Sequence, residues 1–395
     1  MTVVPSSGDA ASLVGRDREL AILRRQLDAA LGGRGSLVLI GGEAGIGKTA
    51  LAEALCREAA EQGALVLVGH CYDLTETPPY GPWTEIRDRI PPDHGLPPQP
   101  SAASTAASQA EFFREALAFF AALADRQPLV LVLDDLQWAD PASLDCLRFL
   151  ARSVASLPIL FVATYRAEGV TRRHPLYTLL PLLMREAGAT RLDLRHLTLA
   201  DVASLMADRY RLPEADATRL VAYLHERAGG NAFFTLELLR ALEEESVLHE
   251  EPDGWAVGDL TAVRVPTLLR QVIDARLDRL GEDAGQLLAA AAVIGQEVPL
   301  DLWQTVAEAD EEALLDLIER ASGARVLEET AEGEGARFLH ALIRQALYEG
   351  IPVIRRKRLH RRIGEVLAER ADTHPDTVAY HLRAAGDARA AGWLV

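Results

Sequence analysis

Gly42-Glu43-Ala44-Gly45-Ile46-Gly47-Lys48-Thr49 fills every fixed position of the phosphate-binding loop pattern GxxxxGK[ST]. The run Ser36–Gly41 before it is short, apolar and bounded by glycines, which is typical of a buried parallel strand. Residues 49–61 after it carry apolar side chains at helical spacing. A strand, a glycine turn and a helix in this order predict that backbone N–H groups at the start of the helix bind phosphates.

Two side chains of this loop have predicted roles in a nucleotide site. Lys48 is one of only two lysines in the chain. A compact charge on a flexible stem suits the β- and γ-phosphate oxygens, so Lys48 is the predicted phosphate ligand. Thr49 is expected to supply its hydroxyl to Mg²⁺. The loop therefore predicts a nucleotide ligand and Mg²⁺ as its cofactor.

Two further runs predict strands that end in polar groups. Leu129–Asp135 is five apolar residues followed by two aspartates, and ligands bind at the carboxyl ends of such strands. We expect Asp134 to hold Mg²⁺ and Asp135 to polarise an attacking water. The run Ile159–Thr164 is followed shortly by Arg166. Arg166 either senses the γ-phosphate or caps the strand and pairs with a surface acid.

Length, charge and cysteine usage narrow the class of protein. A chain of 395 residues suggests two or three domains, and no apolar run is long enough for a membrane span. Cys56, Cys71 and Cys146 form no metal or disulfide pattern, so we interpret them as buried free thiols of a cytoplasmic protein. A formal net charge of −17 disfavours nucleic-acid binding as the main role of this segment.

Four stretches together resemble the STAND signal-transduction ATPases, which are related to the AAA+ class. The likeness is strongest to the large ATP-binding regulators of the LuxR type, and it covers most of the chain. The stretches are Val14-Gly15-Arg16-Asp17, the phosphate-binding loop, Asp134-Asp135-Leu136-Gln137-Trp138-Ala139-Asp140 and Thr164-Tyr165-Arg166. The resemblance implies that Val14, Gly15 and Arg16 lie against the adenine and ribose, and that Arg166 is a sensor arginine.

The resemblance also implies two nucleotide contacts in the second half of the chain. Gly229-Gly230-Asn231-Ala232 resembles the family's lid motif, in which a proline usually follows the asparagine; here that position is Ala232. A helix that stops at glycine before a new helix is the alternative interpretation of this stretch. His340 is placed where the family's histidine contacts the β-phosphate of ADP, although Ala341 replaces the aspartate that follows it in the best-known version.

The sequence also predicts an order of domains. The fold expected is an α/β P-loop NTPase with a parallel, AAA+-like sheet, followed by helical domains. Its parts are a flexible leader (1–12), the ATPase domain (13–195), a helical lid (196–260), a winged helix (261–350) and the start of a tetratricopeptide-like array (351–395). A mobile loop is expected at 91–109, and the array suggests the front end of a longer protein.

Charge argues against DNA binding by the predicted winged helix. Residues 266–350 hold 17 acids and 7 arginines, whereas a DNA-binding face needs clustered positive charge. The basic run 354–362 is interpreted as a solvated helix face whose apolar side carries Ile354, Leu359, Ile363 and Leu367. DNA contacts would then come from a domain outside this segment.

Together these patterns predict an ATP/ADP switch in a cytoplasmic regulator. ADP would hold a closed state, ATP would allow self-association, an unidentified inducer would trigger exchange, and slow ATP hydrolysis would reset the module. The alternatives are an AAA+ replication initiator, which would bind DNA, and a motor-type AAA+ ATPase, which would turn over quickly as a ring. Regulation of a catalytic partner elsewhere in a longer chain is a further possibility.

Overall fold

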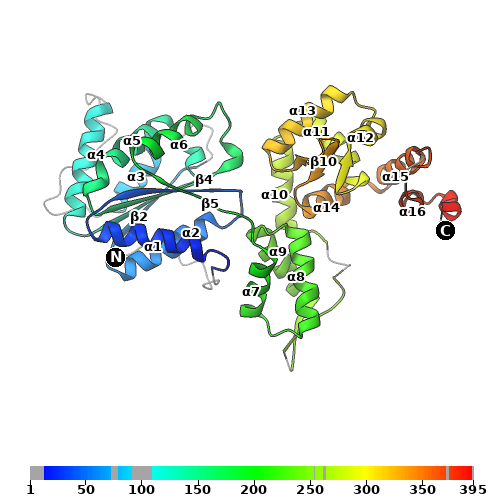
Figure 1. The fold of residues 1–395 in the computed structure, drawn as a ribbon, viewed down its shortest axis with the longest axis horizontal. Coiled ribbons are helices and arrows are strands. Elements are labelled where there is room, and N and C mark those ends of the chain that lie inside the picture. Colours follow the sequence, from blue (N-terminus) through cyan, green and yellow to red (C-terminus); the bar gives the residue numbers. More distant parts are fainter. Residues whose placement is uncertain are drawn as a thin grey trace. The chain divides into compact units, whose positions relative to one another are not determined.

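The chain forms two compact units, Met1–His196 and Leu197–Val395, each with its own hydrophobic core (Figure 1). The computed structural model describes residues 13–72, 79–90, 109–252, 254–260, 264–370 and 373–393. The predicted leader (1–12) and residues 91–108 of the predicted mobile loop lie outside this described part. None of the described helices is long and apolar enough to cross a membrane.

A five-stranded parallel sheet organises the N-terminal unit. The strand order is β2-β3-β4-β1-β5. The strands are β1 (Ser36–Gly42), β2 (Leu65–His70), β3 (Leu129–Asp134), β4 (Ile159–Arg166) and β5 (Thr190–Asp193). The chain runs from β1 to the far edge at β2 and later returns to place β5 on the other side of β1. Connections that diverge in this way open a crevice at the carboxyl ends of the strands.

Helices cover both faces of this sheet, as the nearly continuous burial of β1, β3 and β4 requires. Val38 and Ile40 of β1 pack with α1 (Asp17–Leu31) and α2 (Lys48–Glu61). Leu37 and Leu39 alternate with these residues along β1 and pack with the remaining helices. Those helices cover the other face of the sheet (Figure 1). These are α3 (Gly81–Asp88), α4 (Gln109–Ala124), α5 (Pro141–Ser153) and α6 (Pro175–Glu186). Three short 3-10 turns lie in the connections between strands and helices of this unit. They are η1 (Leu136–Trp138), η2 (Val154–Ser156) and η3 (Ala167–Gly169). The predicted parallel α/β fold is confirmed.

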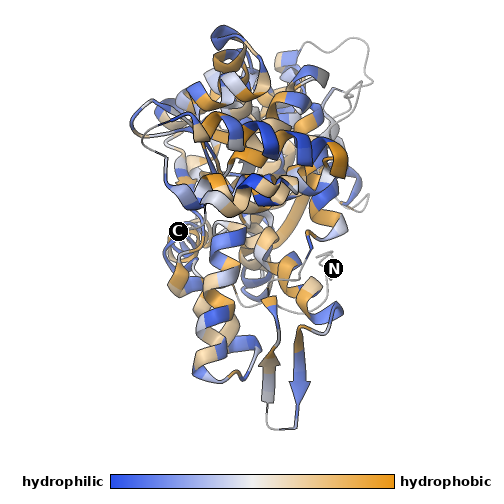
Figure 2. Cartoon of the chain, turned by 90° about the vertical axis from the view of Figure 1, so that its right-hand side faces the viewer, coloured by the Kyte–Doolittle hydropathy of each residue, from blue (hydrophilic) through white to orange (hydrophobic). Residues whose placement is uncertain are grey.

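The C-terminal unit is mostly helical, and its helices show apolar and polar stretches in alternation (Figure 2). Its first helices are α7 (Leu199–Arg209), α8 (Glu214–Ala228), α9 (Ala232–Glu244), α10 (Thr267–Asp278) and α11 (Glu282–Ile294). The later ones are α12 (Leu300–Ala307), α13 (Glu311–Gly323), α14 (Ala341–Gly350), α15 (Val353–Ala368), α16 (Pro375–Ala385) and the 3-10 turn η5 (Ala388–Trp393). One apolar cluster runs through this unit from Leu197 to Ala390.

Two small antiparallel sheets interrupt these helices. β6 (Leu248–Glu251) pairs with β7 (Gly254–Val257). β10 (Gly335–Phe338) lies between β8 (Glu297–Pro299) and β9 (Leu327–Glu329). β9 and β10 form an antiparallel hairpin, and the winged-helix assignment of residues 261–350 stays a prediction.

Local sequence signals place the ends of several helices. Thr198 caps α7, and Thr198 and Asp201 form the reciprocal hydrogen bonds of a capping box. α8 ends at Gly229, whose φ of 58° is left-handed. Asn231 then caps α9 by accepting a hydrogen bond from the Phe234 N–H. The interpretation of this stretch as a glycine stop followed by a new helix is confirmed.

The predicted apolar face of α15, the helix that contains the basic run 354–362, is wrong at Ile354. Ile363 and Leu367 of α15 are buried, but Ile354 is 87% exposed. Nine residues separate Ile354 from Ile363, and at 3.6 residues per turn this spacing puts them on opposite sides of a helix. Several arginines of α15 bind groups of this same unit: Arg356 donates to Tyr348 O, Arg362 to Thr305 O, and Arg361 pairs with Asp387.

Two buried histidines join α14, α15 and α16. His360 and His381 are 1% and 2% exposed, and their Nδ1 atoms lie 2.9 Å apart. The Tyr348 hydroxyl lies 3.0 Å from Nε2 of His360. All three groups are satisfied if Tyr348 donates to Nε2 of His360 and the Nδ1–H of His360 donates to His381. Burial lowers the pKa of both histidines to about 4, and the positive charge of Arg356 adds to this effect at His360.

We expect this pair to make the C-terminal unit less stable in mild acid. Because the pKa of each histidine is lower in the folded chain (about 4) than in the unfolded chain (6.5), the unfolded state binds more protons between these values. Stability is therefore full above pH 6.5 and falls toward pH 4, by up to about 1.4 kcal/mol per pH unit for each histidine. Urea unfolding at several pH values measures this slope. The variant His381→Gln should show a shallower slope, and an unchanged slope would contradict the assignment.

Gly229 offers a second test of packing in this unit. An alanine Cβ at this position would lie 2.4 Å from Nδ1 of His340. Gly386 ends α16 with a similar left-handed φ of 73°, but a Cβ there meets no atom within 4 Å. Both alanine variants should lose about 1–2 kcal/mol to the backbone conformation. Gly229→Ala should lose roughly a further 1–3 kcal/mol to the clash. Equal melting temperatures of the two variants would show that His340 does not pack tightly on Gly229.

Candidate nucleotide-binding site

The phosphate-binding loop is a tight turn between β1 and α2. Gly45 and Gly47 have φ values of 80° and 106°, which an L-residue adopts only with strain. Ile46 between them is 1% exposed and anchors the loop in the core. Gly47 is the N-cap of α2, so the free N–H groups of the first helical turn open toward the loop. This arrangement binds anions through the backbone and the helix dipole.

The Lys48 side chain folds across this loop. It is 6% exposed, and its Nζ atom donates to the carbonyl oxygens of Gly42 at 3.1 Å and Glu43 at 2.8 Å. Burial lowers the pKa of Lys48, and the negative charges of Glu168, Asp135 and Asp134 oppose that effect. The ammonium group is thus held at the mouth of the loop, where an anion can replace the carbonyl oxygens as its partner.

The first turn of α2 and the carboxyl ends of β3 and β4 bring Thr49, Asp134 and Thr164 together. The Thr49 Oγ1 lies 3.4 Å from each carboxylate oxygen of Asp134. Thr164, which is fully buried in β4, donates to Asp134 Oδ1 at 2.5 Å. The Asp135 N–H in turn donates to the Thr164 hydroxyl at 2.9 Å. The Asp134 carboxylate is therefore fixed in front of the Thr49 hydroxyl.

This pair of oxygen donors fits Mg²⁺. Mg²⁺ prefers oxygen ligands at 2.0–2.1 Å in octahedral geometry, which places neighbouring ligands about 3 Å apart. The 3.4 Å between Thr49 and Asp134 needs only a small adjustment to reach that spacing. Waters and phosphate oxygens usually complete such a site, so one hydroxyl and one carboxylate are sufficient on the protein side.

Asp135 and Arg166 form an ion pair with each other. Arg166 Nη2 lies 3.0 Å from Asp135 Oδ2. Asp135 has a φ of 59°, which is uncommon for a residue other than glycine and clusters at functional sites. The sequence left open whether Arg166 senses phosphate or pairs with an acid. The structure brings it to the acid predicted to polarise water, so each group holds the other.

Gln137 is a supporting residue that the sequence analysis did not single out. It is 4% exposed, and its Oε1 accepts a hydrogen bond from the Arg166 N–H at 2.9 Å. Its carbonyl oxygen lies 2.9 Å from Nε2 of His174. Asp140 caps α5 through the Ser143 N–H. The distinctive 134–140 stretch thus combines two site carboxylates with residues that fix the ends of β4 and α5.

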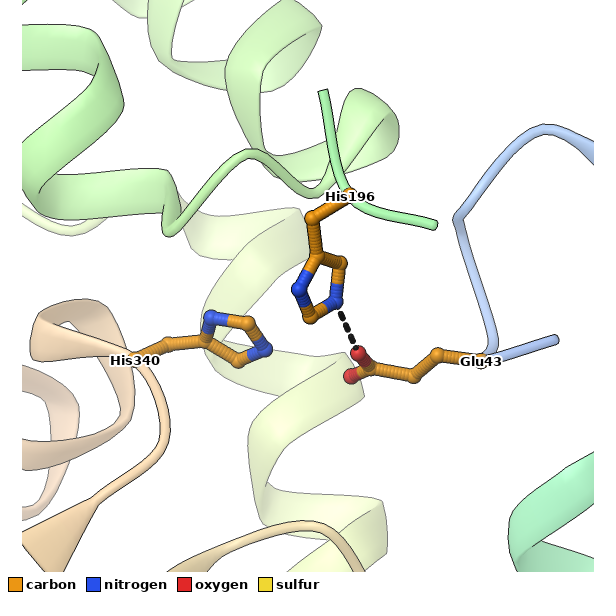
Figure 3. A group of neighbouring side chains, drawn as sticks. All are labelled: Glu43, His196 and His340. Atoms are coloured by element: carbon orange, nitrogen blue, oxygen red, sulfur yellow. Dashed lines mark hydrogen bonds and ion pairs between the residues drawn. The ribbon is translucent and has the colours of Figure 1, made fainter. Parts of the chain in front are cut away.

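The remaining N-terminal site candidates lie around the loop. Arg16 is 5% exposed and donates to Ile46 O at 2.9 Å, so the segment containing Val14 and Gly15 is attached to the phosphate-binding loop. Glu43 is 7% exposed and accepts a hydrogen bond from His196 Nε2 at 2.7 Å if that nitrogen carries the proton (Figure 3). His196 therefore ties the loop to the segment that follows β5.

Asn231 and His340 belong to the C-terminal unit. Asn231 is fully buried and caps α9. His340 is 1% exposed, and its ring lies edge-on to Phe234 with 5.4 Å between the centroids. Packing within this unit accounts for the conformation of both residues. Their contacts with a nucleotide stay predictions that rest on the family resemblance.

Glu168 is the charged residue of this site that the sequence reasoning missed. It lies in η3, directly after β4, and its Oε1 accepts a hydrogen bond from the Ala44 N–H at 2.7 Å. No sequence motif includes Glu168. Its distance from the predicted strand end was the available signal, because an acid two residues after Arg166 lies at the ligand-binding edge of the sheet.

The hydroxyl of Thr164 gives a direct test of this geometry. Thr164→Val keeps the shape of the side chain but removes the bond to Asp134 and leaves the Asp135 N–H without its acceptor. We expect a loss of about 1–3 kcal/mol in the stability of the N-terminal unit. Differential scanning calorimetry of the full chain measures it. Thr164→Ser keeps the hydroxyl and is the matched control, so the valine variant should melt at the lower temperature. The reverse order would contradict the hydrogen-bonded network.

Comparison with known proteins agrees with this geometry. Residues 12–162 match the model of the AAA ATPase domain. An uncharacterised protein of Rhizobium meliloti (strain 1021) is 26% identical over 397 residues. That match covers 89% of this chain and 36% of the relative, so the chain spans about a third of the relative's length.

A solved structure with a similar fold agrees with this architecture. A Walker-type ATPase of Pyrococcus abyssi superposes with a TM-score of 0.55 at 14% identity, covering 85% of this chain and 96% of that one. A STAND protein with a tetratricopeptide repeat sensor from Pyrococcus horikoshii has a TM-score of 0.34 at 15% identity, covering 92% of this chain and 48% of its own, too distant to support an argument. Residues 12–162 therefore resemble the AAA ATPase domain, and the N-terminal unit has the parallel α/β fold of the P-loop ATPases.

Proposed function

We propose that this chain is the ATP- and ADP-binding switch module of a cytoplasmic signal-transduction ATPase that resembles the LuxR-type regulators. The observation that carries this proposal is the meeting of Lys48, Thr49 and Asp134 at one edge of the sheet. A lysine for phosphate, a hydroxyl and a carboxylate for Mg²⁺, and a backbone anion site are the parts that a P-loop nucleotide site requires. The match to the AAA ATPase domain supports the same assignment.

Nucleotide binding would proceed through these residues in defined roles. The loop N–H groups and Lys48 hold the phosphates, and Thr49 and Asp134 hold Mg²⁺, which neutralises part of the phosphate charge. Arg16 and its neighbours Val14 and Gly15 are attached to the loop through Ile46 and are the proposed contacts for the base and ribose. Adenine as the base rests on the family resemblance.

Slow hydrolysis fits the ion pair between Asp135 and Arg166. Asp135 Oδ2 accepts a hydrogen bond from Arg166 Nη2 at 3.0 Å, so this oxygen already has a partner other than an attacking water. Arg166 is likewise engaged with Asp135 rather than available to a γ-phosphate. Both groups must separate before either assists the reaction, which suits a module that holds a nucleotide and reports its identity.

The switch part of the proposal concerns the whole protein. ADP would maintain a closed state, and exchange for ATP would allow self-association and release an output domain in a longer chain. Any DNA contact would lie outside this segment, because residues 266–350 are strongly acidic and the arginines of α15 named above bind groups within their own unit. Asn231 and His340 are the proposed nucleotide sensors of the C-terminal unit.

The two lysines of the chain allow a clean test. Lys48→Ala should weaken the binding of Mg²⁺-ADP and Mg²⁺-ATP by about a hundredfold or more, because it removes the buried cation of the loop. Lys357→Ala removes the only other lysine, on the exposed side of α15, and should leave both affinities unchanged. Isothermal titration calorimetry on the full chain gives the dissociation constants. Wild-type protein that binds neither nucleotide would falsify the proposal.

The same preparation separates a switch from the alternative functions. A switch should hydrolyse ATP with a kcat well below about 1 s⁻¹, which is the lower end of ordinary turnover numbers. Fast turnover by a preformed ring would instead indicate a motor. Tight, salt-sensitive binding of duplex DNA by this chain would indicate an initiator.

A further inference from the structure

A carboxylate from the end of β4 reaches the phosphate-binding loop. Glu168 Oε1 accepts the Ala44 N–H at 2.7 Å, and this bond joins η3 to the third residue of the loop across 124 positions of sequence. Nothing in the P-loop pattern requires an acid there. The loop binds anions through its backbone, and Glu168 presents an anion of the chain's own to one of those N–H groups.

The second oxygen of this carboxylate has an unusual environment. Glu168 Oε2 is buried, and in the part of the chain that the structure describes it has no hydrogen-bond partner. A buried carboxylate oxygen without a partner is costly, so a purely structural role would be an inefficient use of a glutamate. Lys48 is the compensating charge: of the charges around it, Glu168 acts most strongly to raise its pKa against the effect of burial.

We propose that Glu168 is a specificity-determining residue that makes the loop favour a nucleoside diphosphate over the corresponding triphosphate. The loop backbone binds the α- and β-phosphates, whereas the lysine is shared by the β- and γ-phosphates. A γ-phosphate near Lys48 therefore competes with the Glu168 carboxylate for the same positive charge, and the two anions repel each other. When a diphosphate is bound, no γ-phosphate is present, and Glu168 keeps its hydrogen bond with the Ala44 N–H.

The consequence for a switch follows from the position of η3. Glu168 lies two residues after Arg166, so a γ-phosphate that displaces the carboxylate moves the segment that carries the Arg166–Asp135 ion pair. Triphosphate binding and the release of Arg166 would then be coupled through one short turn. This inference rests on the proposed nucleotide-binding function and adds to it the group that discriminates between the two nucleotides.

The test compares diphosphate and triphosphate affinities in matched variants. Glu168→Gln keeps the acceptor for the Ala44 N–H and removes the charge, and Glu168→Ala removes both. Glu61→Gln makes the same charge change at an exposed position at the end of α2. Calorimetry with Mg²⁺-ADP and a non-hydrolysable ATP analogue gives the ratio of dissociation constants. In both Glu168 variants the ratio of triphosphate to diphosphate Kd should fall about tenfold or more, with the control unchanged.

Each other result counts against the inference in a distinct way. An unchanged ratio in both Glu168 variants would overturn it while the proposed nucleotide binding stands. An equal gain for both nucleotides would show a general charge effect rather than discrimination. A loss of triphosphate binding would show that Glu168 supports the γ-phosphate. Wild-type chain that binds neither nucleotide would remove the proposed function itself, and the inference with it.

Discussion

The parallel register of β1, β3 and β4 is the constraint on which the candidate site depends. Ile40 of β1 is opposite Thr164 of β4, and Leu133 of β3 is opposite Ala163. This register ends the three strands at one edge of the sheet, so the loop after β1 meets the carboxylate at the end of β3. The Thr164 hydroxyl then fixes Asp134 in front of Thr49. A slip of one residue would turn Thr164 to the other face and remove that link.

Charge at this edge is not balanced for a polyphosphate. Lys48 and Arg166 are positive, whereas Asp134, Asp135 and Glu168 are negative. Among these five side chains the acids outnumber the bases by one, so a bound cation would offset their excess negative charge. This imbalance explains physically why binding should depend on Mg²⁺, and why each added phosphate should be harder to accommodate. The same electrostatics would oppose fast turnover and favour a module that retains a diphosphate.

The sequence predicted the sheet and the centre of the site because both depend on local patterns. Apolar runs that end in glycine or aspartate identify strands of a parallel sheet, and Lys48, Thr49 and Asp134 follow directly from them. The contacts of Gln137 and Glu168 could not be predicted, because they join positions 29 and 124 residues apart; for Glu168 the spacing after Arg166 indicated only its place at the edge of the sheet. The error at Ile354 has a different origin, since an apolar residue in a helical run was assigned to a face without counting its rotation from Ile363.

Packing explains part of the family motif in the C-terminal unit, at Gly229, Asn231 and His340. This explanation neither requires nor excludes a nucleotide contact. Gly229 must be glycine because its left-handed φ and the His340 ring leave no space for a Cβ. Asn231 is favoured because its side chain caps α9. Both requirements hold in a protein that binds no nucleotide, so these residues cannot by themselves identify a sensor. His340 is different, because a helix N-cap whose side chain makes no capping bond gains nothing from histidine in that role. Its packing on Gly229 and Phe234 is one physical reason for a ring at this position, and an imidazole is also a group that can bind a ligand.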